Sequence, residues 1–158
     1  MRKYCGNCNS MQNVLEKEEV KTYQIKDTEI TAQTLTLTCV NCNEQIYDKV
    51  TESINDIIIF DTYKKMHNLL TSTEIIHMRE KYDLSQSAFS KILGFGLKTI
   101  TRYENGSIQD EAHDNLLRLV RSQSNFLILW EQRKKYLSDK ENDKVKNALL
   151  NTKKLDYR

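Results

Sequence analysis

The chain has 158 residues, a net charge of +2, four cysteines, four glycines and no proline. Its length allows one domain or two small ones, and the scarcity of glycine and proline predicts mostly regular structure. No apolar run approaches the roughly twenty residues of a membrane helix, and the amino terminus, Met-Arg-Lys-Tyr-Cys, lacks the apolar segment of a signal peptide. We therefore expect no membrane partner and a cytoplasmic location, where thiols stay reduced.

The four cysteines form two Cys-x-x-Cys pairs, Cys5 with Cys8 and Cys39 with Cys42. In a reducing compartment, such pairs are more typical of metal ligands than of disulfides. Four thiolates suit the tetrahedral coordination of zinc and leave no position open for a water or substrate. We therefore predict one structural Zn²⁺ ion, with an iron-sulfur or redox dithiol site as the alternative.

Two strands are predicted between the cysteine pairs, over residues 14–25 and 29–38, around a turn at Asp27-Thr28. Leu35, Leu37 and Cys39 alternate and so share one face of the second strand. The hairpin brings the two cysteine pairs together. A domain this small buries little apolar area, so metal binding would supply much of its folding free energy.

Residues 48–70 predict one helix, which completes an amino-terminal zinc-binding domain over residues 1–70. A capping box at residues 71–74 then marks a new helix and the start of a second domain, residues 71–122. The predicted inward face of this new helix is Ile75, Ile76, Met78 and Tyr82. The apolar stripe expected along the connector helix consists of Val50, Ile54, Ile57, Ile58, Tyr63 and Leu69 or Leu70.

Residues 84–106 predict two short helices joined by a tight turn, which is a helix-turn-helix. Ser85 is a suitable N-cap for the first helix, and apolar residues follow it at helical spacing. Gly94-Phe95-Gly96 breaks that helix, because a tight turn needs backbone angles that a Cβ atom opposes. The second helix is expected from Leu97, and Asn105-Gly106 ends it.

The second helix has two different faces. Leu97, Ile100 and Glu104 are expected to pack inward, whereas Lys98, Thr99 and Arg102 point outward. An outward arginine can hold guanine bidentately, so this face suits base edges in the major groove. The alternative is an ordinary solvated helix face. The first helix presents its amino terminus to the phosphate backbone, where Gln86 can donate a hydrogen bond. The predicted DNA-binding set is therefore Gln86 together with Lys98, Thr99, Thr101 and Arg102 of the second helix.

The carboxy-terminal part predicts more helices. Asp110 can cap a helix that runs to about Ser122 and closes the small bundle. Residues 123–158 form a further extension, in which a capping box at 138–141 starts the last helix. Five consecutive apolar residues end at Trp130, more than one helix face can bury, so we predict a dimer interface at Phe126, Leu129 and Trp130. The alternative is an additional buried core helix.

Residues 118–158 are also the most basic part of the chain, with 11 basic and 5 acidic side chains. Its lysines could contact DNA phosphates, or they could form an ordinary solvated polar face. The lysines concerned are Lys134, Lys135, Lys153 and Lys154.

The stretch from Leu84 to Gly106 resembles the XRE-type (Cro/repressor-like) helix-turn-helix family. Together with the cysteine pairs, residues 1 to about 120 resemble the MqsA-type antitoxins, in which a zinc domain precedes this fold. The resemblance implies that the zinc domain binds and inhibits a toxin, an RNA-cleaving enzyme. It also implies that Gln86 holds a phosphate and that Lys98 and Arg102 read bases. Lys98 stands where the family typically has Asn, which implies a different operator sequence.

We therefore predict an α+β chain, with a small four-cysteine zinc domain that contains a β-hairpin, followed by an all-α XRE-type helix-turn-helix bundle with extra carboxy-terminal helices. The predicted function is a sequence-specific transcriptional repressor that is the antitoxin of a type II toxin-antitoxin pair and binds a palindromic operator as a homodimer. The alternative is a dedicated transcriptional regulator, for example of a mobile element, without a toxin partner. No Ser/His/Asp order, phosphate loop or catalytically spaced carboxylate pair occurs, so we predict no enzyme.

Overall fold

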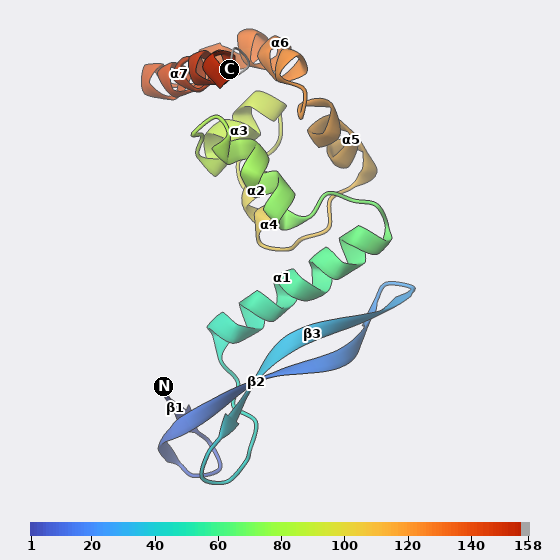
Figure 1. Ribbon diagram of the computed structural model, residues 1–158, viewed down its shortest axis with the longest axis vertical. Helices are drawn as coiled ribbons and strands as arrows, with labels where there is room; N and C mark the ends of the chain where they lie inside the picture. Colours follow the sequence, from blue (N-terminus) through green and yellow to red (C-terminus); the bar gives the residue numbers. More distant parts are fainter. Residues whose placement is uncertain (156–158) are drawn as a thin grey trace. The chain divides into compact units, whose positions relative to one another are not determined.

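The computed structural model describes the backbone of residues 1–155 and the side chains of residues 1–150. The chain divides into two compact units, Met1–His67 and Asn68–Arg158. The amino-terminal unit contains a three-stranded antiparallel sheet and one helix, and the carboxy-terminal unit is helical (Figure 1). The predicted α+β class, with clustered cysteines ahead of a helical bundle, is confirmed.

The sheet has the order β1-β2-β3, with β1 at Arg2–Cys5, β2 at Ser10–Ile25 and β3 at Thr28–Cys39. The hairpin expected between the cysteine pairs is confirmed as β2 and β3, which pair continuously from Val14↔Cys39 to Ile25↔Thr28. Strand β1 was not predicted, because four residues are too few to show a periodic pattern. It covers only the first four residues of β2.

Strand β3 contributes side chains to two different buried regions. In its first half the even-numbered Ile30, Ala32 and Thr34 are buried, on the side of helix α1. In its last residues the odd-numbered Leu37 and Cys39 are buried instead, in a cluster with Cys5. The alternation predicted for Leu35, Leu37 and Cys39 is therefore right for the last two, whereas Leu35 is only half-buried.

Helix α1, Lys49–Met66, is shorter than predicted. Asp48 caps its start by accepting a hydrogen bond from the backbone N–H of Thr51. The helix ends at Met66 rather than Leu70, because the backbone turns at Asn68, whose φ is +52°. Asparagine tolerates this left-handed conformation better than most residues and so ends helices readily.

The apolar stripe predicted along α1 is only partly right, because Tyr63 is buried as expected but the first two members of the stripe are not. Val50 and Ile54 are exposed, and the buried face includes Thr51, Asn55 and Ile59. The reason is that α1 lies along the edge of the sheet, where backbone groups need polar partners. Asn55 provides them: its Oδ1 accepts from Leu35 N at 2.8 Å, and its Nδ2 donates to Leu35 O at 2.9 Å. A buried polar residue therefore replaces a neighbouring strand.

The carboxy-terminal unit follows its predicted capping signals. Thr71 and Glu74 form both bonds of a capping box, Ser85 accepts from the N–H of Ala88, and Asp110 accepts from that of His113. A second reciprocal pair joins Ser138 and Glu141. The elements are α2 (Ser72–Glu80), α3 (Gln86–Leu93), α4 (Thr99–Glu104), α5 (Glu111–Leu119), α6 (Gln123–Arg133), a short 3₁₀ helix η1 (Lys134–Tyr136) and α7 (Asp139–Leu155).

One hydrophobic core serves this whole unit, including the carboxy-terminal extension. Phe126 is fully buried and stacks on Tyr82 with ring centroids 3.8 Å apart. Trp130 is 5 % exposed, and its Nε1 donates to Asn142 Oδ1 at 3.0 Å. The prediction that Phe126 and Trp130 form a dimer interface is therefore wrong, because α6 turns these residues into its own subunit at i, i+4 spacing. Leu129 is half-buried, and its role in dimerisation stays a prediction.

The extension also contacts both ends of α3. Arg133 Nε donates to the carbonyl of Lys91, in the last turn of α3, at 2.6 Å. Lys144 Nζ donates to the carbonyl of Asp83, just before the helix, at 3.1 Å. Helices α6 and α7 therefore brace the first helix of the predicted helix-turn-helix. The side chains of Lys153 and Lys154, proposed above as phosphate contacts, lie outside the described residues.

Trp130→Ala should lower the free energy of unfolding of the carboxy-terminal unit by about 3 to 5 kcal/mol, because it removes a large buried side chain. Urea titration followed by circular dichroism measures this loss. Gln132→Ala on the same helix is the matched control, since Gln132 is exposed and its substitution should cost about 0.5 kcal/mol or less. Equal effects of the two variants would contradict the burial of Trp130 in the core.

Candidate functional site

The structure brings the four predicted metal ligands together. Cys5 ends β1, Cys39 ends β3, and Cys8 and Cys42 lie in the turns that follow. The Sγ atoms of Cys5 and Cys42 are 3.6 Å apart, those of Cys8 and Cys39 are 3.8 Å apart, and all four lie within 4.8 Å of one another. A tetrahedral ion with metal–sulfur bonds of about 2.3 Å requires sulfur atoms about 3.8 Å apart. The cluster can therefore hold a metal ion.

Polar groups around the sulfur atoms perturb the ionisation of two thiols. The Asn7 side chain and the Glu44 backbone donate hydrogen bonds that lower the pKa of Cys42 to about 6. At Cys8 the Asn41 amide, 3.3 Å from Sγ, lowers the pKa, but the bond to Cys42, burial and the other sulfurs outweigh it and raise the pKa to about 12. Neighbouring thiols resist full deprotonation because their negative charges would repel one another, and a bound metal cation would offset this repulsion.

The turn between α3 and α4 differs from the prediction at its second helix. Gly94 has φ +76° and ends α3, as expected for a residue without Cβ. Helix α4 begins at Thr99, two residues later than predicted, and the N–H of Thr99 bonds to the Gly96 carbonyl at 2.9 Å. The helical face assignment was therefore wrong at two positions. Leu97 is 61 % exposed rather than packed, and Thr99 is 5 % exposed rather than presented.

The structure divides the predicted DNA-binding set into three groups. Lys98 and Arg102 are exposed and one helical turn apart, since Arg102 N bonds to Lys98 O at 3.0 Å. Gln86 and Thr101 are half-buried and bonded to each other, with Thr101 Oγ1 donating to Gln86 Oε1 at 2.7 Å. Thr99 is buried and belongs to neither group. Leu97, which sequence reasoning had placed inside, joins the exposed residues.

An ion pair between half-buried Arg79 and buried Glu104 lies next to these residues. Glu104, 5 % exposed, accepts from Arg79 through both carboxylate oxygens, at 2.6 Å from Nε and 3.0 Å from Nη2. The bonds to Glu104 raise the pKa of the Arg79 guanidinium. Gln86 Nε2 donates to the same carboxylate at 2.7 Å. The burial of Glu104 was predicted correctly, whereas its partner Arg79 was not predicted, although a buried carboxylate in itself calls for a cation.

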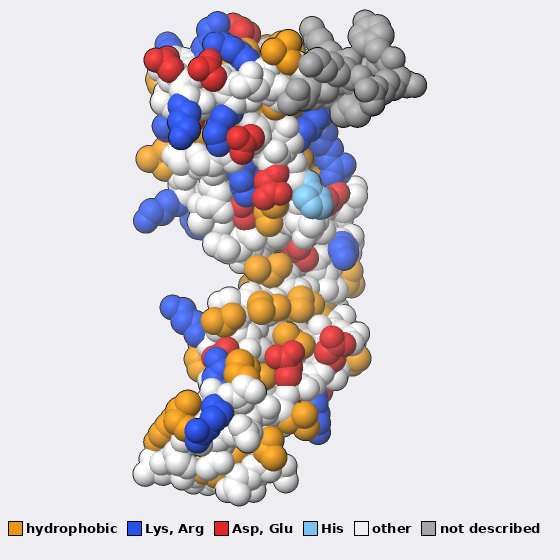
Figure 2. Space-filling model, turned by 60° about the vertical axis from the view of Figure 1, so that its left-hand side comes forward, with side chains coloured by type: hydrophobic (Ala, Val, Ile, Leu, Met, Phe, Trp, Pro, Cys, Tyr) orange, Lys and Arg blue, Asp and Glu red, His pale blue; other side chains and the backbone are white. Residues whose placement is uncertain are grey.

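Charges of both signs are mixed on the face of the carboxy-terminal unit that Figure 2 draws, where lysines and arginines alternate with aspartates and glutamates. On this face electrostatic attraction to nucleic acid would be local, because neighbouring charges of opposite sign partly cancel. Across the helices that the structure describes, no segment has both the length and the hydropathy to cross a membrane.

The family comparison is decisive for the greater part of the chain. The model of the MqsA family, described as the antitoxin component of a bacterial toxin-antitoxin system, matches residues 1–129. The chain belongs to the MqsA antitoxin family. No curated protein matches it significantly. The MqsA match covers the cysteine cluster and the α3–α4 pair and ends within α6, so η1 and α7 lie beyond the MqsA pattern.

Cys39→Ser should remove one ligand from the cluster and unfold the amino-terminal unit, because metal binding is expected to supply much of its folding free energy. Bound metal measured by elemental analysis should fall, and amide NMR signals of the sheet should collapse while those of helices α2 to α6 persist. Thr38→Ser, one residue away and outside the cluster, is the matched control. Loss of the helical signals as well would show that the two units do not fold independently.

Proposed function

We propose that this antitoxin represses transcription by binding DNA through α3 and α4, and neutralises a toxin through its amino-terminal unit. The observation that carries the DNA-binding part is the exposure of Leu97, Lys98 and Arg102. We call these three residues the reading surface. Leu97 and Lys98 lie just before α4 and Arg102 lies in its last turn, and the opposite side of this short helix is anchored in the core by Ile100 and Tyr103.

Each member of the reading surface suits a different feature of the major groove. The Arg102 guanidinium can donate two parallel hydrogen bonds to guanine O6 and N7. Lys98 offers a flexible ammonium to the same acceptors, and Leu97 offers an apolar contact to the methyl group of thymine. Gln86 at the start of α3 faces the phosphate backbone in this arrangement. Thr99 is omitted from the contact set because it is buried.

Zinc is the proposed occupant of the four-cysteine cluster. The sulfur spacing fits its bond length, and a complete set of four thiolates leaves no open coordination position for catalysis. The ion is therefore assigned a structural role, in which it fixes the ends of β1 and β3. This assignment agrees with a regulatory rather than an enzymatic protein.

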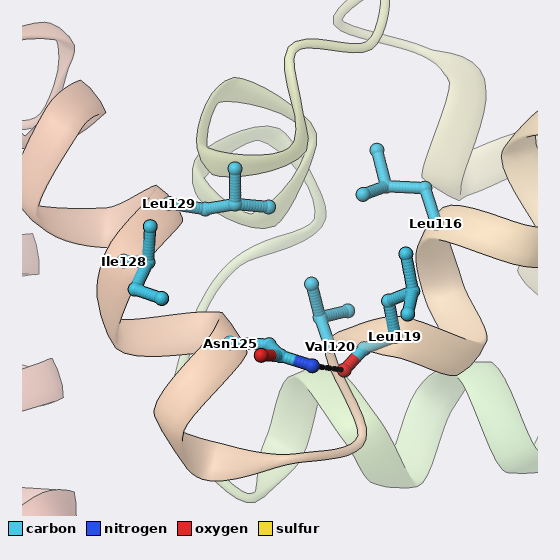
Figure 3. Close-up of a pocket in the computed structure, with 6 residues that line it drawn as sticks. All are labelled: Leu116, Leu119, Val120, Asn125, Ile128 and Leu129. Atoms are coloured by element: carbon cyan, nitrogen blue, oxygen red, sulfur yellow. Dashed lines mark hydrogen bonds between the residues drawn. The ribbon is translucent and has the colours of Figure 1, made fainter.

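A second copy of the chain is the proposed cover for an apolar groove between α5 and α6. Figure 3 shows the residues that line it, with Asn125 Nδ2 bonded to the Leu119 carbonyl at 2.9 Å at one end. Leu119 and Ile128 are 59 % and 57 % exposed. Homodimerisation here would serve DNA binding, because a twofold protein reads two half-sites of a palindrome. The lining residues are Leu116, Leu119, Val120, Asn125, Ile128 and Leu129.

The open edge of β2 is the proposed toxin contact. Because Asn55 bonds both backbone groups of Leu35 at the outer edge of β3, the paired residue Glu18 must point its own backbone groups away from β3. The backbone N–H and C=O of Val20, two residues further along β2, point away from β3 in the same way. Among the described strands none pairs with this edge beyond Val14. An unpaired edge can accept a strand from another protein.

The alternative function is a dedicated transcriptional regulator with the same DNA-binding unit and no toxin. It is favoured only by the common use of four-cysteine ribbons as plain scaffolds. The two functions share the reading surface and differ in the partner of the amino-terminal unit. The gene next to this one decides between them, because an antitoxin is expected to adjoin the gene for its toxin.

Arg102→Ala should cost about 1 to 3 kcal/mol of operator affinity while the chain stays folded, because the side chain is exposed and its proposed bonds are made only to DNA. Mobility shift with promoter DNA from upstream of the gene measures the loss. Arg121→Ala is the control, since this exposed guanidinium lies after α5 and pairs with Glu74. Unchanged affinity of the Arg102 variant would exclude it from the reading surface.

Val20→Pro should abolish co-purification with the product of the adjoining gene, because proline removes an N–H directed at the open edge of β2. The sheet itself should persist, since proline is tolerated at edge positions whose N–H faces solvent. Val20→Thr, which changes the side chain and keeps the N–H, should bind normally. Retained binding of the proline variant would rule out pairing at this edge, and failure of the wild type to bind would favour the dedicated regulator.

A further inference from the structure

We propose that the ion pair between half-buried Arg79 and buried Glu104 positions Gln86 for its contact with DNA, so that Arg79 and Glu104 act on DNA binding without touching it. This inference rests on the proposed function of α3 and α4. It assigns two positioning residues to the DNA-binding unit, one in α2 and one at the end of α4. The link between them and DNA is the side chain of Gln86.

The four side chains form one connected chain of hydrogen bonds. Arg79 donates hydrogen bonds to both carboxylate oxygens of Glu104. Glu104 Oε2 also accepts from Gln86 Nε2 at 2.7 Å, and Gln86 Oε1 accepts from the Thr101 hydroxyl at 2.7 Å. The guanidinium also donates its Nη1 to the Leu84 carbonyl at 2.8 Å, two residues before α3. The network therefore joins α2, the start of α3 and the outer side of α4.

The charge on Glu104 decides which way the Gln86 carboxamide faces. An ionised carboxylate only accepts hydrogen bonds, so the nitrogen of Gln86, and not its oxygen, must be turned toward Glu104. The oxygen then receives the Thr101 hydroxyl. A carboxamide has two N–H groups, and these bonds use one of them, so the second remains for a phosphate oxygen.

Arg79 supplies the cation that a carboxylate at this depth requires. A carboxylate 5 % exposed loses most of its hydration, and this cost must be offset by a cation and well-placed donors. Without the guanidinium, or with a neutral side chain at position 104, the Gln86 carboxamide is free to rotate by 180°. Its oxygen would then face the phosphate and repel it.

A double-mutant cycle on the full chain tests this inference. The variants are Gln86→Ala, Glu104→Gln and the double substitution, and the probe is a duplex that the wild-type chain selects from a random-sequence library. Affinity is measured by fluorescence anisotropy at several salt concentrations, at a temperature where circular dichroism finds every variant folded. Glu74→Gln is the matched control, because it also neutralises a carboxylate that is paired with an arginine, in the capping box of α2.

If Glu104 acts through Gln86, each single substitution should weaken binding by about tenfold or more, as expected for a lost hydrogen bond to a charged group. The salt slope should fall by about one per subunit. Glu104→Gln should then have no further effect in the Gln86→Ala background, and Glu74→Gln should bind as the wild type does.

Two other results would overturn the inference in distinguishable ways. If the effects of Gln86→Ala and Glu104→Gln on affinity simply add, or if Glu74→Gln weakens binding equally, Glu104 contributes only to stability and the positioning role is excluded. If the wild-type chain selects no duplex at all, the proposed DNA-binding function fails, and this inference fails with it.

If Glu104→Gln unfolds the chain, Arg79→Lys provides the same test. This substitution keeps a cation but loses the bidentate hydrogen bonding of the guanidinium to Glu104. The result supports the inference if the loss of affinity again disappears in the Gln86→Ala background, and overturns it if the loss remains.

Discussion

A carboxylate inside a protein must be matched by a cation, and this requirement organises the carboxy-terminal unit. Glu104 lies at the end of a helix of six residues, which is too short to be stable on its own. Its bonds to Arg79 and Gln86 fasten that helix to α2 and α3, while Ile100 and Tyr103 anchor the same helix in the core. The surface proposed to read DNA is therefore held in place by side chains behind it, of which only Gln86 is proposed to contact DNA itself.

The amino-terminal unit solves a different problem, because it has little apolar material to bury. Its helix lies along the edge of the sheet with a largely polar buried face, and Asn55 completes the hydrogen bonding of β3 in the way that another strand would. The sulfur cluster joins the ends of β1 and β3 at the open end of the hairpin, away from the turn between β2 and β3. A protein built in this way relies on directional bonds rather than on buried area, and it leaves apolar side chains such as Val20 and Val50 exposed.

Sequence patterns predicted the parts of the molecule that depend on local rules. The capping residues Thr71, Ser85 and Asp110 and the glycine turn follow from contacts within a few residues. The cysteine cluster and the hairpin join residues farther apart, but the repeated Cys-x-x-Cys spacing and the strand pattern made both predictable. The predictions were wrong where a residue's exposure or orientation depends on a partner far away in the sequence. The polar face of α1 depends on the edge of β3, the inward turn of Trp130 depends on α7, and the exchange of Leu97 and Thr99 depends on where α4 starts.

The position of Val145 in the core has a consequence for how the protein is made. This residue is fully buried and packs in the same cluster as Ile75 and Phe89, although it lies 70 and 56 residues after them in the sequence. During translation the amino-terminal unit leaves the ribosome first, whereas the helical unit lacks part of its interior until α7 has been synthesised. In a nascent chain the proposed toxin-binding edge of β2 is therefore complete before the core that supports the proposed reading surface.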